Sequence, residues 1–166
     1  MNNVVLIGMP SSGKSAVGIR LAELLGYGFI DSDRVIEGFE EKKLSELIEE
    51  HGADGFLKIE ERVNCGLDVS RCVIATGGSV VYSARAMESL KKNGKIVYLY
   101  VDVQTVKERI PDFVSRGVVM RGELYGVEDL YKERVPLYER YRDITVNCTN
   151  KTLSQIAEEI FELVSE

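Results

Sequence analysis

The chain has 166 residues and a formal net charge of −6 at pH 7, and 45% of its residues are apolar or aromatic. This length and apolar content predict one domain, residues 1–166, around a single core, and they exclude wholesale disorder. The negative charge disfavours a general binder of nucleic-acid phosphates, and the apolar runs are far shorter than the ~20 residues of a membrane-spanning helix. No basic segment precedes an apolar stretch at the start, so we expect a soluble, cytoplasmic, monomeric protein without nucleic-acid or membrane partners.

Short β-branched runs alternate along the chain with longer amphipathic patterns. The runs predict buried strands at 3–7, 28–31, 72–75, 96–100 and 144–147. The amphipathic patterns predict helices at 14–25, 44–50, 55–69, 84–93, 103–113, 127–140 and 153–164. This alternation is typical of an α/β fold, and we expect a three-layer sandwich around a five-stranded parallel sheet. A polar stretch with several glycines, at about 111–126, does not fit a core element and predicts a lid.

A phosphate-binding loop follows the first predicted strand. Residues Gly8 to Ser15 read GMPSSGKS, which fits the pattern GxxxxGK[ST] without a gap. Its glycines allow a tight turn in which backbone N–H groups point at phosphate oxygens, and the positive end of the following helix faces the same anion. Lys14 is expected to reach the β- and γ-phosphates, and the Ser15 hydroxyl to bind Mg²⁺. The loop, with a strand before it and a helix after it, predicts a P-loop NTPase type of nucleotide site.

Other common reaction centres are disfavoured by the residue counts. The three cysteines, Cys65, Cys72 and Cys148, are odd in number and lack CxxC spacing, so neither a disulfide framework nor a zinc site is expected. The only histidine, His51, stands where a helix is expected to end, and a cation at that end is favourable in itself. A Ser-His-Asp triad or a two-histidine metal site is therefore hard to build from this chain.

Polar residues also follow the second and third predicted strands. Asp31 and Asp33 end the second strand, and Thr76-Gly77-Gly78-Ser79 follows the third. Ligands of open α/β sheets bind in the crevice at the carboxyl ends of the strands. One aspartate can hold Mg²⁺ through water while the other meets an acceptor hydroxyl, and an equally good interpretation is a pair of helix caps. Asp102, after the fourth strand, is predicted to cap the next helix rather than to bind metal.

With these motifs in place, the chain resembles the shikimate kinase family along nearly its full length. The matching features, in family order and spacing, are the phosphate loop, Asp31-Ser32-Asp33, Phe56 with Glu60-Glu61, the Gly77-Gly78 turn, the arginines of the 111–126 stretch and Arg134-Val135-Pro136-Leu137-Tyr138. The phosphate loop is generic, whereas the Asp-x-Asp and Arg-x-Pro-Leu-Tyr motifs together are specific. The resemblance implies a kinase of the nucleoside-monophosphate-kinase type that phosphorylates a ring hydroxyl of shikimate with ATP and Mg²⁺.

The resemblance also implies a role for each matching position. ATP binding is carried over to Gly8, Ser11, Ser12, Gly13, Lys14, Ser15 and Ala16, with Arg109 over the adenine and Arg116 reaching the transferring phosphate from the lid. Mg²⁺ binding is carried over to Ser15, with Asp31 joining through water, and acceptor binding to Asp33, Gly77, Gly78, Arg134 and the position of Leu57. Lys14, Asp33 and Arg116 form the expected catalytic set. Asp33 is expected mainly to orient the hydroxyl, because phosphoryl transfer depends on positioning and charge neutralisation more than on a strong base.

The chain departs from the family pattern at three places. Leu57 stands where the family has an arginine for the acceptor's carboxylate, and Lys58, about 100° further around a helix, cannot simply replace it. Ser79 stands in place of a third glycine, and Arg116-Gly117 in place of an Arg-Pro, so Arg121 competes with Arg116 for the catalytic role. Shikimate is the leading acceptor. A kinase for another polyol or hydroxy acid and a non-catalytic ATP-binding regulator stay open as alternatives.

Overall fold

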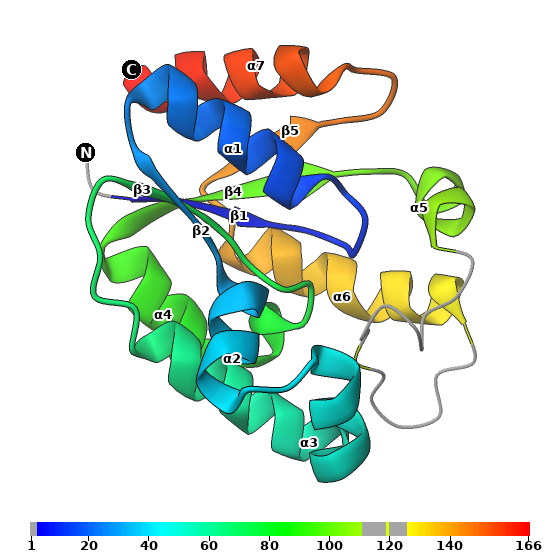
Figure 1. The fold of residues 1–166 in the computed structure, drawn as a ribbon. Helices are drawn as coiled ribbons and strands as arrows, with labels where there is room; N and C mark the ends of the chain where they lie inside the picture. The colour runs from blue at the N-terminus through cyan, green and yellow to red at the C-terminus, as the bar shows by residue number, and fades with distance from the viewer. Residues whose placement is uncertain (1–2, 111–118, 120–125) are drawn as a thin grey trace.

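Five parallel strands form the centre of the computed structural model, which describes residues 3–110, 119 and 126–166 (Figure 1). The strands are β1 (Asn3–Ile7), β2 (Gly28–Asp31), β3 (Cys72–Ala75), β4 (Gly94–Tyr100) and β5 (Ile144–Asn147). They lie in the order β2-β3-β1-β4-β5, and each neighbouring pair is parallel. The predicted α/β fold with a five-stranded parallel sheet is confirmed.

Helices cover both faces of this sheet. They are α1 (Lys14–Leu25), α2 (Ser32–Glu40), α3 (Leu44–Cys65), α4 (Ala84–Lys92), α5 (Val103–Arg109), α6 (Val127–Tyr141) and α7 (Leu153–Ser165). Figure 1 shows α1 and α7 on one face and α4 and α6 on the other, which gives the expected three layers. Within the described ranges, no helix is both long and apolar enough to cross a membrane.

Three sequence-based expectations differ from the structure. The helices predicted at 44–50 and 55–69 are one element, α3, with a break at Gly52, whose φ of 71° and ψ of 177° are not helical. Residues 66–69 are not helical, because Gly66 ends α3 and its N–H donates to Arg62 and Val63 carbonyls. Strand β2 was expected to be buried, yet its residues are half-buried or exposed because it forms an edge of the sheet.

The predicted helix caps are confirmed at three positions. The Asp102 carboxylate accepts from the Thr105 N–H at 2.9 Å, which is the capping role expected of it. Ser83 caps α4 and Thr152 caps α7 in the same way. These bonds satisfy backbone donors that the first turn of a helix leaves without a partner.

Two separate apolar clusters hold the fold together. The larger cluster includes all the apolar residues of β1, which is fully buried, and the buried centre of β4, residues 96–99. The smaller one lies between α2 and α3 and consists of Ile36, Leu47, Phe56, Ile59, Val63 and Val119. Burying a large aliphatic or aromatic side chain contributes about 1.5–3 kcal/mol. The α2–α3 unit therefore has a core of its own, and it forms one wall of the crevice at the carboxyl ends of β1, β2 and β3.

Candidate active site

The phosphate loop connects β1 to α1 at the carboxyl edge of the sheet. Gly13, at the N-cap of α1, has a φ of 94°, a conformation that favours glycine, and no side chain caps the first turn of α1. The first N–H groups of α1 are therefore left for a ligand. A side chain at Gly8 would place its Cβ 2.8 Å from the Leu99 carbonyl oxygen, so this position needs glycine as well. The local geometry is that of an anion-binding loop.

Lys14 lies across the inside of this loop. Its Nζ donates to the Gly8 carbonyl at 2.8 Å and to the Met9 carbonyl at 2.9 Å, and its side chain is buried. Burial lowers the pKa of this ammonium to about 8, while the carboxylates of Asp33, Asp31 and Glu60 oppose that change. A phosphate held by the loop would add negative charge beside Lys14 and favour the protonated form. Lys14 is thus placed to neutralise phosphate charge.

Asp31 faces Ser15 at the end of β2. The Ser15 hydroxyl donates to Asp31 Oδ2 at 2.9 Å, and Asp31 Oδ1 accepts from the backbone N–H groups of Asp33 and Arg34 at 3.0 and 3.4 Å. Asp31 is therefore the N-cap of α2, and it lies beside the phosphate loop at the same time, while its role toward Mg²⁺ stays a prediction. The described residues contain no cluster of three or more histidine, cysteine or acidic side chains that could hold a metal.

The Ser15–Asp31 pair nevertheless fits Mg²⁺. This ion prefers oxygen ligands, keeps several of its waters, and is usually bound through one or two protein groups together with substrate phosphates. A hydroxyl and a carboxylate side by side at a phosphate loop are such groups. The pair suits a magnesium–nucleotide complex better than a free metal ion.

Asp33 and Glu60 converge on Gly77. A Cβ at Gly77 would lie 2.6 Å from Asp33 Oδ1 and 2.8 Å from Glu60 Oε2, so the absence of a side chain lets both carboxyl groups occupy the same corner. Burial, together with the charge of Asp31, raises the pKa of Asp33 to about 6. Lys14 opposes this rise. Asp33 thus comes from β2–α2 and Glu60 from α3, and the turn after β3 brings them together.

Glu60 is bound by Ser79 rather than by a cation. The Ser79 hydroxyl lies 2.7 Å from Glu60 Oε1 and 2.9 Å from Oε2, and both side chains are buried. Among the ion pairs of the described residues, none joins Glu60 to a lysine or arginine. Burial raises the pKa of Glu60 to about 8. The sequence analysis noted both residues but had no signal that they would form a pair.

Arg134 is the largest fully buried side chain, with 1% of its surface exposed. Its Nη2 donates to the Val119 carbonyl at 2.5 Å, and its Nε donates to the Tyr82 hydroxyl at 3.3 Å. A Cβ at Gly78 would lie 2.9 Å from Arg134 Nη1, so this glycine also allows a close approach. An arginine buried in this way is not a solvated surface charge. It lines the same cavity as Lys14 and Asp33, and its role toward the acceptor stays a prediction.

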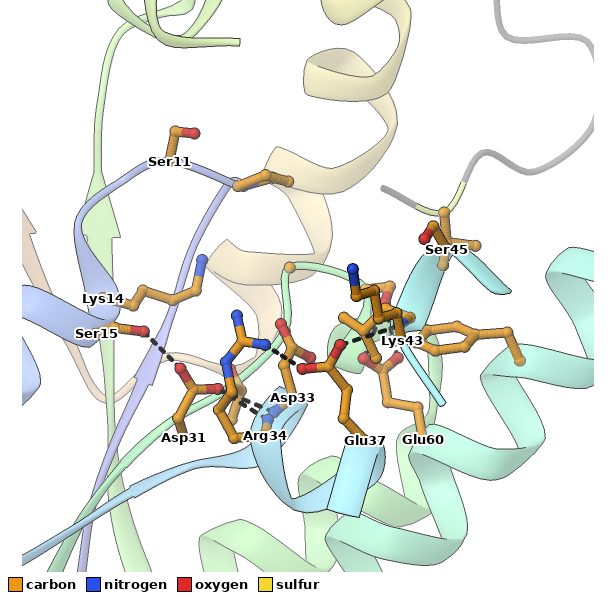
Figure 2. Close-up of a pocket in the computed structure, with 18 of the residues that line it drawn as sticks. Ser11, Lys14, Ser15, Asp31, Asp33, Arg34, Glu37, Lys43, Ser45 and Glu60 are labelled. Atoms are coloured by element: carbon orange, nitrogen blue, oxygen red, sulfur yellow. Dashed lines mark hydrogen bonds and ion pairs between the residues drawn. The ribbon is translucent and has the colours of Figure 1, made fainter. Parts of the chain in front are cut away.

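One cavity of about 630 Å³ joins these groups (Figure 2). The predicted residues that line it are Ser11, Gly13, Lys14, Ser15, Ala16, Asp31, Asp33, Gly77, Gly78 and Arg134. Glu60 and Ser79 line it too, as do Arg34, Glu37 and Lys43, for which no motif gave a signal. Figure 2 shows Lys14 and Ser15 on one side of this space and Glu37, Lys43 and Glu60 on the other. After the predicted roles, we name the part of the cavity beside the phosphate loop the nucleotide end and the part around Asp33, Glu60 and Arg134 the acceptor end.

Other predicted residues lie elsewhere. Gly8 and Ser12 belong to the loop without lining the cavity, and Ser12 is buried. Arg109 Nη1 donates to the Ser11 carbonyl at 3.1 Å, which brings it to the nucleotide end. Leu57 does not line the cavity and packs against the cluster between α2 and α3.

The predicted lid lies mostly outside the described residues. Residues 111–118 and 120–125 fall in this part of the chain, so the predictions for Arg116 and Arg121 stay predictions. Val119 is described and buried, and it belongs to the smaller cluster. Its contact with Arg134 is the link between this stretch and the acceptor end.

Comparisons with known proteins agree on one family. A family model described as shikimate kinase matches residues 10–165. The chain is 35% identical over 161 residues to a shikimate kinase of a Sulfurihydrogenibium species, covering 96% of each protein. It is similar to the structure of shikimate kinase from Acinetobacter baumannii in complex with shikimate, with a TM-score of 0.90, 32% identity, and 99% and 93% of the two chains covered. The shikimate kinase structure from Aquifex aeolicus matches with a TM-score of 0.83, 28% identity, and 98% and 96% covered.

Proposed function

The chain belongs to the shikimate kinase family, and from this premise we propose how its own residues transfer the γ-phosphoryl group of ATP to a ring hydroxyl of shikimate. The observation that carries the proposal is one continuous cavity, which has the phosphate loop at one end and Asp33, Glu60 and Arg134 at the other. A kinase of this class needs both substrates in one water-poor space, so that transfer to the acceptor outcompetes hydrolysis.

At the nucleotide end, the loop amides and Lys14 bind the phosphates. Lys14 already lies inside the loop, and its charge would neutralise the oxygens of the transferring group. Ser15 and Asp31 would hold Mg²⁺, Asp31 through water, and the ion would supply further neutralisation of phosphate charge when bound. Arg109 is proposed to contact the nucleotide, which its bond to the Ser11 carbonyl supports. Arg116 stays the proposed lid cation at the γ-phosphate.

At the acceptor end, Asp33 orients the hydroxyl that is phosphorylated. The acceptor oxygen forms its bond to phosphorus while the bond to the bridging oxygen of ADP breaks, and the hydroxyl proton passes to Asp33 or onward to solvent. Because the transition state is loose, correct placement of the oxygen contributes more than the basicity of Asp33. Arg134 binds the carboxylate of the acceptor, where the buried guanidinium needs no further ordering. Gly77 and Gly78 leave room for the ring.

We further propose that residues 1–166 act as one kinase domain and that the enzyme is a monomer in the cytoplasm. The phosphate loop, the two aspartates, Glu60 and Arg134 line one cavity, which supports a single kinase domain. A kinase that draws on the cellular ATP pool works where that pool is, which supports the cytoplasmic location.

The first experiment is ADP release from MgATP, with and without shikimate, and with a panel of other polyols and hydroxy acids. We expect shikimate to stimulate release strongly and the other compounds to have little effect. Stimulation by a different compound alone would keep the mechanism and replace the acceptor. Nucleotide binding without stimulation by any compound would favour a regulator and contradict the proposal.

A further inference from the structure

Among the described residues, four cationic side chains line the cavity, and three of them have partners in the protein. Lys14 donates to two loop carbonyls, Arg34 forms an ion pair with Glu37, and Arg134 donates to the Val119 carbonyl and the Tyr82 hydroxyl. The fourth is Lys43. Its amino group takes part in no hydrogen bond or ion pair recorded among residues 3–110, 119 and 126–166. Of the described cations that line the cavity, Lys43 is therefore the one whose charge is still available.

The backbone around Lys43 is firmly held. The Lys43 N–H donates to Glu46 Oε2 at 2.8 Å, and the next N–H, of Leu44, donates to Glu37 Oε2 at 3.1 Å. Glu37 is on α2 and Glu46 is in the first turn of α3, so the connection between these helices is fixed at both ends. Figure 2 shows Lys43 among the cavity-lining side chains, on the side where Glu37 and Glu60 lie. A flexible lysine stem on a fixed backbone can adjust to a ligand without moving the wall.

Acidic side chains are numerous at the acceptor end. Asp33, Glu37 and Glu60 all line the cavity, as does Asp31 nearer the nucleotide. An acceptor that brings a carboxylate into this space needs cationic contacts, because an unpaired charge near other carboxylates and away from water is costly. Neighbouring positions on α3 do not supply one. Leu57 is apolar, and Lys58 is exposed and does not line the cavity.

We propose that Lys43 is a specificity-determining residue that binds the carboxylate of the acceptor together with Arg134. The buried arginine provides the fixed contact, and the lysine provides an adjustable one from the α2–α3 connection. This inference rests on the proposed function, because it takes shikimate, a carboxylate-bearing polyol, as the acceptor. It adds a residue that the sequence motifs did not indicate.

The test compares Lys43→Met with Lys58→Met in the full chain. Methionine keeps most of the length of the lysine stem and removes its charge, and Lys58 is an exposed lysine of the same region that lies outside the cavity. For Lys43→Met we expect the KM for shikimate to rise by about 10- to 100-fold, the range for loss of a charged hydrogen bond, with kcat and the KM for ATP nearly unchanged. Lys58→Met should match the wild type, and Lys43→Arg should retain most of the affinity.

A second substrate identifies the group that Lys43 contacts. Shikimate methyl ester has the same ring hydroxyls and no carboxylate, so wild type and Lys43→Met should use it about equally. An unchanged KM for shikimate in Lys43→Met, or an equal loss with acid and ester, would overturn the role of Lys43 while leaving the proposed function in place. A wild type that shows no shikimate-dependent ADP release would instead overturn the proposed function and this inference with it.

Discussion

Replacing Glu60 by glutamine tests whether this carboxyl group is neutral in the folded protein. Glu60 is buried, is bound by the Ser79 hydroxyl, and has no ion pair to a described cation. Glutamine has nearly the same size and keeps an oxygen that can accept from Ser79, but it does not titrate. The variant therefore removes the ionisation of one side chain and leaves the packing almost unchanged.

The magnitude follows from the two pKa values. An unfolded glutamate titrates near its ordinary value of 4.5, whereas burial raises the pKa of Glu60 to about 8 in the fold. Between these values the folded protein holds one proton more than the unfolded chain, so this group makes the protein less stable as the pH rises. The slope is about 1.4 kcal/mol per pH unit, or ~3 kcal/mol from pH 5.5 to 7.5. Glu60→Gln lacks this pH-dependent contribution to the unfolding free energy.

The assay is urea unfolding of wild type and Glu60→Gln at several pH values between 5 and 8. The difference in unfolding free energy cancels the other titrating groups, and it should move in favour of Glu60→Gln by ~3 kcal/mol over two pH units. Glu158→Gln, at an exposed position of α7, is the control and should run parallel to the wild type. A difference that does not change with pH would show that Glu60 is ionised in the fold, and the reasoning from burial would be refuted.

Three further substitutions test the site. Lys14→Met should lower kcat by at least ~100-fold with the fold intact by circular dichroism, because phosphate charge is no longer neutralised; near-normal turnover would contradict its role. Gly77→Ala should lower the free energy of unfolding by about 1–3 kcal/mol and lower kcat, since its Cβ would meet two carboxyl oxygens. Gly38→Ala, whose Cβ meets nothing within 4 Å, is the control and should be neutral or slightly stabilising in thermal unfolding. Leu57→Arg should cost about 1–2 kcal/mol of folding stability in lost packing without lowering the KM for shikimate, because Leu57 packs against the smaller cluster and does not line the cavity; a lower KM would mean that this position does face the acceptor.

Much of the fold and of the nucleotide end could be predicted from local sequence. Four of the five strands have the predicted bounds, because a buried β-branched run between turn residues has little choice of structure. The phosphate loop was predictable for a similar reason, since its chemistry depends on backbone amides and on one lysine at a fixed spacing. The end of α3 at Gly66 was missed, because an apolar pattern continued past a glycine cap.

The acceptor end depended on contacts between segments far apart in the chain. Glu60 and Ser79 are 19 residues apart, and no sequence signal indicates that they touch. They become a buried pair because α3 packs against the turn after β3. Lys43 lies outside every motif, and only the packing of α2 against α3 places it at the cavity.

The sequence by itself determined the fold class and the nucleotide loop, because periodicity and backbone turn chemistry act over a few neighbouring residues, and its resemblance to the shikimate kinase family indicated the reaction class. Tertiary structure decided which charged side chains line the cavity and which are paired or buried. Burial and proximity set the charge state of a carboxyl group, and both arise only when distant segments pack together.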